Sequence, residues 1–244
     1  MKRLLTIGLA SVLAMTLAAC GGGGDSSAAA PTVPTAEGFW EGTSSNGATV
    51  GLAILEDGQT WGYYARGGVI EGALKGVTSS SGTTLSGSGT DFDLQNRTVS
   101  SGTYNGTFSP RSVIRINTSS GASLTATYVV SYDQPASLAA LAGTFSGSSV
   151  TGSTSPQAQQ VNISAAGAIT VSTTAGCSAS GSAVPRQSGK NIFDVAVTFT
   201  GTSCALGNGT VTTGIGYYSA TTGNLLVMGL NAAKTDGFIY AGFK

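Results

Sequence analysis

The residues that could do chemistry in this chain are carboxylates, serines, lysines and three cysteines, because its 244 residues include no histidine. Without histidine the chain cannot form a Ser-His-Asp triad, a Cys-His pair or a His-liganded zinc site. A serine nucleophile would then need a lysine as its base. None of Lys75, Lys190, Lys234 and Lys244 stands in a Ser-x-x-Lys context. We therefore predict that the protein is not an enzyme and that it holds no cofactor.

Two short acidic segments remain as candidates for a metal or catalytic site. Residues 91–96 (Asp-Phe-Asp-Leu-Gln-Asn) place oxygen ligands at alternate positions, as a calcium loop does. They lack the glycine and the distal glutamate of an EF-hand, so we favour the alternative of a strand. In that strand Phe92 and Leu94 point inward, the carboxylates lie in water and a turn follows at Asn96. The second segment, Glu56-Asp57, is followed by Gly58 and is typical of a hairpin turn. Neither segment predicts a bound metal.

The N-terminal segment has the order of a secretory signal. Lys2 and Arg3 precede an apolar run from Leu4 to Leu17, which is shorter than the ~20 residues that a membrane-spanning helix needs. Leu17-Ala18-Ala19-Cys20 then resembles the lipobox of bacterial lipoproteins at all four positions. The resemblance implies cleavage before Cys20, a diacylated thioether on its sulfur and acylation of the new amine. Two or more acyl chains hold a protein stably on a membrane. The alternative is a plain secreted protein with a chance cysteine.

The residue after the cleavage box bears on the location of the protein. In the sorting rule of enterobacterial lipoproteins an aspartate at this position favours the inner membrane, and here it is Gly21. The resemblance therefore implies an anchor in the outer membrane, and it leaves open which face of that membrane carries the protein.

The two remaining cysteines, Cys177 and Cys204, are expected to form a disulfide. Paired cysteines in an exported protein are typical of a structural bridge. The rival interpretation, a redox pair, does not fit, because redox motifs have the spacing Cys-x-x-Cys. A bridge across about 27 residues would contribute roughly 3 kcal/mol by restricting the unfolded chain.

Composition excludes one class of partner and bounds the organisation of the chain. The 11 basic and 11 acidic residues balance, only 9% of residues are charged and no basic block stands out, so we predict no nucleic-acid partner.

Residues 1–19 are the expected signal peptide, and residues 20–37 are the lipidated cysteine and a flexible Gly/Ser/Ala/Pro tether. The rest divides into expected domains at 38–134 and 135–244.

Both halves have the pattern of antiparallel strands. Apolar residues alternate with polar or small ones, for example at Val50, Leu52 and Ile54, at Ile114 and Ile116, from Leu124 to Tyr132, and from Phe193 to Phe199. Five dipeptides between such runs predict hairpin turns: Asn46-Gly47, Asp57-Gly58, Ser81-Gly82, Ser120-Gly121 and Thr222-Gly223. We expect about eight strands in each half, a number at which a sheet can close into a barrel. The predicted fold is all-β, with two small up-and-down barrels.

The two halves begin alike. A single helical pattern, from Pro135 to Ala142, lies between them and predicts the joint. Gly38-Phe39-Trp40-Glu41-Gly42 opens the first half and Gly143-Thr144-Phe145-Ser146-Gly147 the second. A Gly-x-aromatic strand of this kind resembles the first strand of lipocalin-type barrels, although Phe145 replaces the family's tryptophan. The resemblance covers about five residues in each half. It implies that Trp40 and Phe145 plug one end of their barrels.

The two halves are also similar in that each contains a pair of adjacent tyrosines. Tyr63-Tyr64 and Tyr217-Tyr218 each put one ring inside a sheet and one outside. The inner ring belongs to the core. The outer ring is either a contact for a protein or glycan or an ordinary exposed tyrosine.

These observations favour a non-enzymatic binding or interaction module, anchored to the outer membrane through Cys20. The Gly-rich tether and the pattern of antiparallel strands also resemble those of surface lipoproteins of the transferrin-binding and factor-H-binding type. The expected partners are the membrane and an envelope protein, a host protein or a glycan. One alternative is a periplasmic inhibitor or immunity lipoprotein against a hydrolase or toxin. The other is a glycan-directed enzyme with a pair of carboxylates in a cleft.

Overall fold

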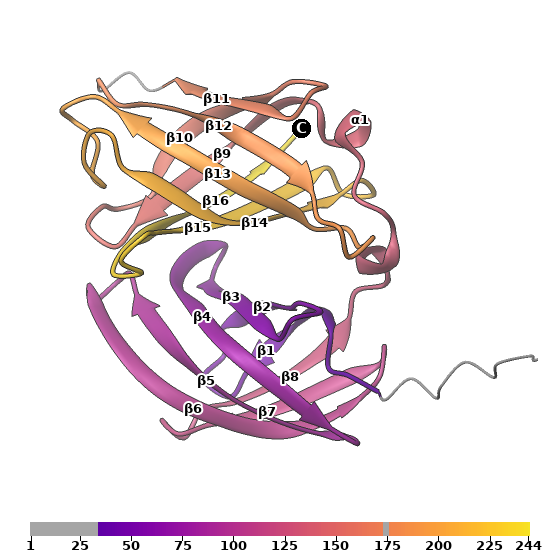
Figure 1. Ribbon diagram of the computed structural model, residues 1–244. Coiled ribbons are helices and arrows are strands. Elements are labelled where there is room, and N and C mark those ends of the chain that lie inside the picture. Colours follow the sequence, from indigo (N-terminus) through magenta and orange to yellow (C-terminus); the bar gives the residue numbers. More distant parts are fainter. Residues whose placement is uncertain (1–33, 173–175) are drawn as a thin grey trace, which may run out of the picture. The chain divides into compact units, whose positions relative to one another are not determined.

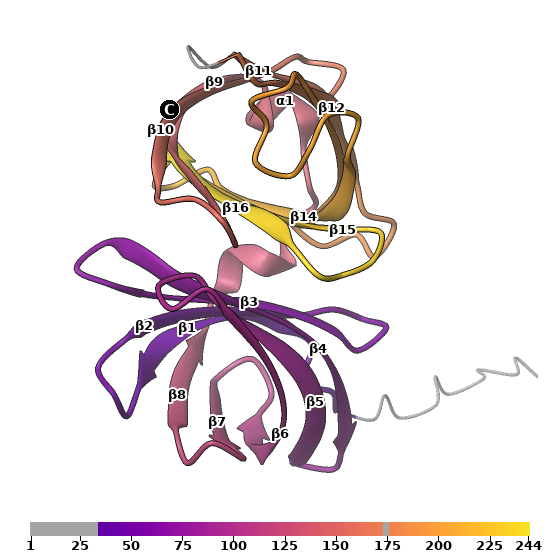
Figure 2. The ribbon, with the colours of Figure 1, turned by 90° about the vertical axis from the view of Figure 1, so that its left-hand side faces the viewer.

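The computed structural model describes residues 34–172 and 176–244. Its sixteen strands close into two antiparallel barrels of eight strands each, in which strands that follow one another along the chain are neighbours (Figures 1 and 2). Closure pairs each strand on both sides and removes exposed sheet edges. The predicted all-β fold with two small barrels is confirmed.

The first barrel contains eight strands, and β1 closes it by pairing with β8, with Trp40 opposite Tyr128. The register of β3 and β4 shifts between Tyr64 and Ala65, which marks a β-bulge. The strands are β1 (Gly38–Ser44), β2 (Thr49–Ile54), β3 (Gln59–Arg66), β4 (Val69–Ser81), β5 (Thr84–Asp93), β6 (Thr98–Ser109), β7 (Val113–Thr118) and β8 (Ser123–Tyr128).

The second barrel follows a connector of two short helical segments, η1 (Val130–Asp133) and α1 (Leu138–Leu141). Helix α1 lies within the predicted helical joint, and its N-cap is Ser137. The barrel closes through the pairing of β16 with β9. Its strands are β9 (Gly143–Thr151), β10 (Gln157–Ile163), β11 (Ala168–Ser172), β12 (Ser178–Pro185), β13 (Phe193–Thr200), β14 (Val211–Ser219), β15 (Asn224–Asn231) and β16 (Gly237–Phe243).

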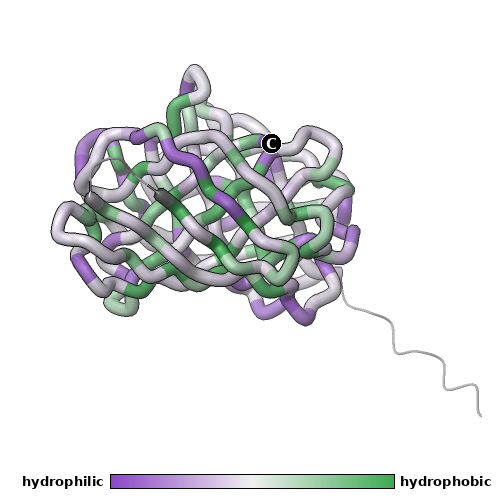
Figure 3. The backbone as a smooth tube through the Cα atoms, turned by 90° about the horizontal axis from the view of Figure 1, so that it is seen from above, coloured by the Kyte–Doolittle hydropathy of each residue, from purple (hydrophilic) through white to green (hydrophobic). Residues whose placement is uncertain are grey.

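Glycine forms the predicted hairpin turns. All five dipeptides lie where consecutive strands meet, with Ser81 as the last residue of β4, and hydrophilic residues gather at many of the turns (Figure 3). A positive φ is as accessible to glycine as a negative one, whereas other residues lose free energy in adopting it. Each of these glycines has a positive φ: Gly47 (83°), Gly58 (80°), Gly82 (59°), Gly121 (88°) and Gly223 (73°). Arg97 and Arg111 adopt the same conformation, with φ of 54° each, in turns without a glycine signal.

The interior of the first barrel is filled by large rings packed against small residues. Trp40 is fully buried, and its Nε1 donates a hydrogen bond to the Ala36 carbonyl at 3.1 Å. The Tyr104 ring covers Gly87, where a Cβ would come within 2.4 Å of the ring. The Ala36 amide donates to Ser80 Oγ at 3.0 Å, which ties the residues before β1 to β4. These contacts occupy the interior of this barrel with its own side chains.

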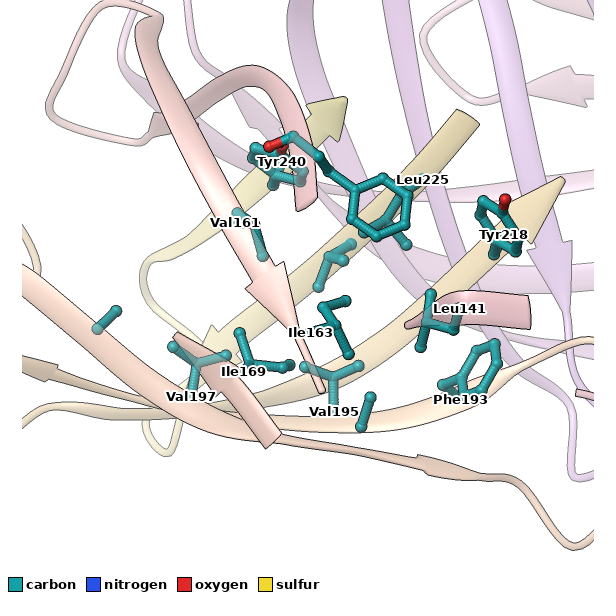
Figure 4. Close-up of a cluster of buried hydrophobic side chains, with 14 residues drawn as sticks. Leu141, Val161, Ile163, Ile169, Phe193, Val195, Val197, Tyr218, Leu225 and Tyr240 are labelled. Atoms are coloured by element: carbon teal, nitrogen blue, oxygen red, sulfur yellow. The ribbon is translucent and has the colours of Figure 1, made fainter. Parts of the chain in front are cut away.

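One end of the second barrel is plugged by α1. Leu141 projects from that helix toward Phe193 and Tyr218 (Figure 4). Phe145 is fully buried beside them, with its ring centroid 5.7 Å from that of Tyr218 in an edge-to-face contact. Edge-to-face pairs add stabilisation beyond the apolar area they bury. Aromatic and leucine side chains therefore close this end.

The outer faces of the two barrels share a buried hydrophobic cluster, which we call the barrel interface. The Phe39 ring of β1 stacks on the Tyr217 ring of β14, with centroids 4.1 Å apart and planes at 9°. The Tyr217 hydroxyl also bonds to Ser131 Oγ at 2.6 Å. The other buried members are Ala53, Leu55, Trp61 and Tyr132 from the first half and Val150, Ile192, Ile215, Met228 and Ile239 from the second. Through this cluster the barrels pack as one compact unit.

Ion pairs border the barrel interface. Arg186 of the second half binds Glu56 Oε1 at 2.8 Å and Asp57 Oδ2 at 3.0 Å in the first half, and Asp194 Oδ1 at 2.7 Å in its own. Partial burial alone would raise the pKa of Asp57. Hydrogen bonds from Gln59 and the charge of Arg186 outweigh that effect and lower the pKa. The predicted Glu56-Asp57 turn therefore joins the two barrels.

The alternation of apolar residues from Leu124 to Tyr132 predicts a single strand, and the second half of that prediction is wrong. Strand β8 ends at Tyr128, and after one more bond to β1, from the Val129 amide to the Phe39 carbonyl, the chain turns into η1. Val130 is consequently 74% exposed, while Tyr132 is buried in the barrel interface.

The hypothesis of an exposed outer tyrosine is wrong for Tyr217. Of this pair Tyr218 points into its barrel, but Tyr217 on the outer face is only 6% exposed because the first barrel covers it. Tyr63 is half-buried beside the barrel interface, and Tyr64 donates to Asp91 Oδ1 at 3.1 Å. The outer ring of each pair thus lies at or beside this interface.

Replacing Phe39 by alanine tests the barrel interface. We expect Phe39→Ala to lower the free energy of unfolding by roughly 3 kcal/mol, because the buried ring and its stack on Tyr217 are lost. Chemical denaturation is the measurement. Val99→Ala, at a side chain 57% exposed, is the control and should change stability by less than about 0.5 kcal/mol. Equal effects of the two variants would contradict the interface.

Candidate ligand-binding site

The second barrel contains a cavity of about 120 Å³ in its lumen. We call it the lumen cavity. Its wall is formed by inward-facing apolar side chains of six strands: Val161, Ile163, Ile169, Val171, Ala179, Val197, Phe199, Val227, Phe238 and Tyr240. Several of these appear in Figure 4, where Val161, Ile169 and Val197 lie away from the plug at Leu141 and Phe193. The cavity occupies the part of the lumen that the plug leaves unfilled.

Polar but uncharged residues border the lumen cavity. Serine, threonine and glutamine side chains come from β9, β10 and the loop between them, from the start of β12 and from the loop after β13, namely Ser149, Thr151, Thr154, Gln157, Gln159, Ser178 and Ser203. No residue that lines it within the described part of the chain carries a charge. An apolar wall with a few polar groups is typical of small-molecule sites. A charged ligand would lose its hydration there without an opposite charge in return.

The tyrosine hydroxyl in the wall of the lumen cavity already has a hydrogen-bond partner. The Tyr240 hydroxyl donates to the Phe145 carbonyl at 3.0 Å, and burial raises the pKa of Tyr240 to about 12. This hydroxyl therefore stays neutral. Phe199 and Phe238 form an edge-to-face pair in the wall, with centroids 5.6 Å apart. Both rings are only partly buried, so they offer aromatic surface to a ligand.

The predicted disulfide is confirmed and lies beside this cavity. Cys177 precedes β12 and Cys204 lies in the loop between β13 and β14, with Cα atoms 4.8 Å apart. In that loop the Gly209 amide donates to the Phe199 carbonyl at 2.7 Å, and the Gly201 amide donates to Asn208 Oδ1 at 2.9 Å. Ser203, Ala205 and Leu206 of the same loop line the cavity. The disulfide therefore fixes the loop that borders the candidate site.

The acidic segment at 91–96 lies in the first barrel. Asp93 accepts hydrogen bonds from the Gln95 and Asn96 amides at 3.0 and 2.9 Å, which makes the predicted turn. The predicted direction of Phe92 is wrong: it points outward and is 6% exposed because the second barrel covers it, while Asp91 faces the lumen beside Tyr64. Burial raises the pKa of Asp91. Within residues 34–172 and 176–244, no group of three metal-ligating side chains could hold an ion.

The lysines have partners other than serine. Lys190 pairs with Asp133 at 2.7 Å, and Lys244 donates to the Ala140 carbonyl at 2.6 Å beside the plugged end. Lys75 donates to Gln59 Oε1 at 3.0 Å. In the described chain no lysine amine bonds to a serine hydroxyl, and the structure therefore brings no Ser-Lys dyad together.

Both predicted plug residues are fully buried and lie inside their barrels, Trp40 in the core cluster of the first and Phe145 in that of the second. Cys20 and its cleavage box lie outside the described residues. No helix in the described segments is long and apolar enough to cross a membrane.

The lumen cavity itself was missed from the sequence. Its one signal was the run of small or β-branched residues at inward positions, such as Val161, Val197 and Ala179.

Comparisons with known proteins add no relative. No family model matches the chain, and neither a curated protein nor a solved structure matches it.

Reducing the disulfide should loosen the loop at the lumen cavity. Opening the Cys177–Cys204 bridge is expected to lower stability by roughly 3 kcal/mol, because the unfolded chain gains freedom. Amides from Gly201 to Thr210 should then exchange with solvent faster, which hydrogen exchange with mass spectrometry measures. Amides of β5 and β6 in the first barrel are the internal control. Two reactive thiols in the unreduced, denatured protein would contradict the bridge.

Proposed function

We propose that this protein is an outer-membrane lipoprotein, anchored through Cys20, whose second barrel binds a small neutral apolar molecule. The observation that carries the proposal is the lumen cavity, with an apolar wall and an uncharged polar border. Protein interiors are close-packed and rarely leave such a volume empty. A cavity of similar size, about 150 Å³, accepts benzene in an engineered protein.

The size of the cavity sets the class of ligand. A single six-membered ring or a short branched alkyl group fills about 120 Å³. Such a group is either the whole ligand or the end of a larger one. In the second case Gln157, Gln159 and Thr154 offer hydrogen bonds to its polar part. Because no described residue of the site is a base, an acid or an activated nucleophile, the proposal is binding and not catalysis.

Toluene binding tests the site. We expect toluene to shift NMR signals of residues around the lumen cavity saturably, and Val227→Phe to abolish this, because the new ring fills the lumen. Val184→Phe is the matched control, since Val184 lies on the same barrel with 55% exposure, and it should bind as the wild type does. Val197→Ala enlarges the cavity and should favour ethylbenzene over toluene. Equal toluene binding by Val227→Phe and the wild type would overturn the proposed site.

Lipid labelling tests the anchor. The complete lipobox motivates the expectation that Cys20→Ser leaves the precursor uncut and unlabelled by radioactive palmitate. Cys204→Ser, the control, should still take up label. Normal processing and labelling of Cys20→Ser would show that the N-terminus is not a lipoprotein signal.

A further inference from the structure

The inward-facing residues of β10 change from polar to apolar along the strand. Every second residue of a strand faces the same side, so the alternate residues from Gln157 to Ile163 form one row in the lumen. The row consists of Gln157, Gln159, Val161 and Ile163, which all line the lumen cavity. Gln157 is exposed and Gln159 is half-buried, whereas the two apolar members are buried. The row therefore runs from an open mouth, at Gln157, to the apolar depth of the cavity.

The side chains of the two glutamines have unused hydrogen-bonding capacity. In the described part of the chain neither carboxamide bonds to another protein group. Other polar groups of the border are bonded within the protein. The hydroxyls of Thr151 and Thr154 share a hydrogen bond at 2.9 Å, and Ser178 Oγ donates to the Thr200 carbonyl at 3.2 Å. A carboxamide has two donor hydrogens and an acceptor oxygen, so the glutamines offer a ligand both kinds of bond.

The spacing along β10 sets the distance between the apolar and the polar part of a ligand. Residues two apart in a strand are separated by about 7 Å, and Gln159 stands one such step from Val161 toward the mouth. Its partner on β9 is Gly147, which has no side chain to occupy the space beside it. A ring packed against Val161 therefore reaches the Gln159 carboxamide with a polar group that is joined to it through roughly two carbon atoms.

The mouth favours an uncharged polar group. The described residues that line the lumen cavity carry no charge. A carboxylate or an ammonium would lose hydration there without gaining an opposite charge. A ligand carboxamide, by contrast, both donates to and accepts from a glutamine carboxamide, so the two groups can pair through two hydrogen bonds.

We infer that the lumen cavity binds an amphiphilic amide, with a ring or short branched alkyl group in its depth and an uncharged carboxamide at its mouth. Gln159 bonds to that carboxamide and so determines which polar group is accepted, while Gln157 lies at the rim. This inference rests on the proposed function, because the ring occupies the place where toluene is expected to bind.

Four ligands that share a phenylpropyl framework test the polar end in the full chain labelled with ¹⁵N. NMR titration of the wild type should show that 3-phenylpropanamide binds at least roughly tenfold more tightly than 3-phenylpropanoate and 3-phenylpropylamine, because each of these carries a charge. In Gln159→Leu the affinity for 3-phenylpropanamide should fall about fivefold, since a neutral hydrogen bond is lost. The affinity for propylbenzene, which lacks a polar group, should not fall. Gln160→Leu, on the outward face of the same strand, is the matched control and should bind all four ligands as the wild type does.

A second variant changes the preference instead of weakening it. Gln159→Glu keeps the size of the side chain and introduces a carboxylate. It should bind 3-phenylpropylamine at least about fivefold more tightly than the wild type does, through a charge-assisted hydrogen bond, and should bind 3-phenylpropanoate more weakly.

The outcomes separate this inference from the proposed function. If neither toluene nor 3-phenylpropanamide shifts signals around the lumen cavity, the proposed function and the inference both fail. If toluene binds there but Gln159→Leu and the wild type bind 3-phenylpropanamide equally well, the inference alone is overturned.

Discussion

Eight closed strands enclose a fixed volume, and whatever fills that volume decides what the barrel can do. The first barrel fills its interior with large rings, such as Trp40 and Tyr104, set against glycine. The second barrel concentrates its large side chains at the end that α1 covers and lines the rest with valine, isoleucine and alanine. Its plug and its cavity are therefore two consequences of one uneven distribution of side-chain volume.

The barrel interface supports the wall of the lumen cavity. Along β15, Val227 points into the lumen while its neighbour Met228 points into the barrel interface, and Tyr240 and Ile239 of β16 are divided in the same way. Strands packed on both faces are held more rigidly than strands with one face in water. The first barrel, whose own interior is filled, thus stabilises the strands that form the cavity wall of the second barrel. Lys75 and Trp61 line a small cavity, of about 30 Å³, between the same two barrels.

The sequence was sufficient for features that depend on local pattern. Alternation at Val50 and Leu52 placed strands correctly, and glycine placed five turns. Features that depend on what covers a surface were not accessible. Alternation places Tyr217 and Tyr218 on opposite faces of their strand, but only the docking of the second barrel on the first determines that the outer face at Tyr217 is buried. The turn at Arg111 lacked a glycine signal, and its residue takes a positive φ beside its ion pair with Asp133. The volume of the lumen cavity is the small difference between the volume that the eight strands enclose and the volume that their side chains fill. No local sequence pattern predicts that difference.

The most direct test of this account is a crystal of the protein pressurised with xenon, which enters apolar cavities without needing a hydrogen bond. Anomalous scattering should place xenon in the lumen of the second barrel, between Val161, Val197 and Val227, and leave the lumen of the first barrel empty of it. A second barrel without xenon, filled instead by its own side chains, would contradict the claim that this lumen is a ligand-binding cavity.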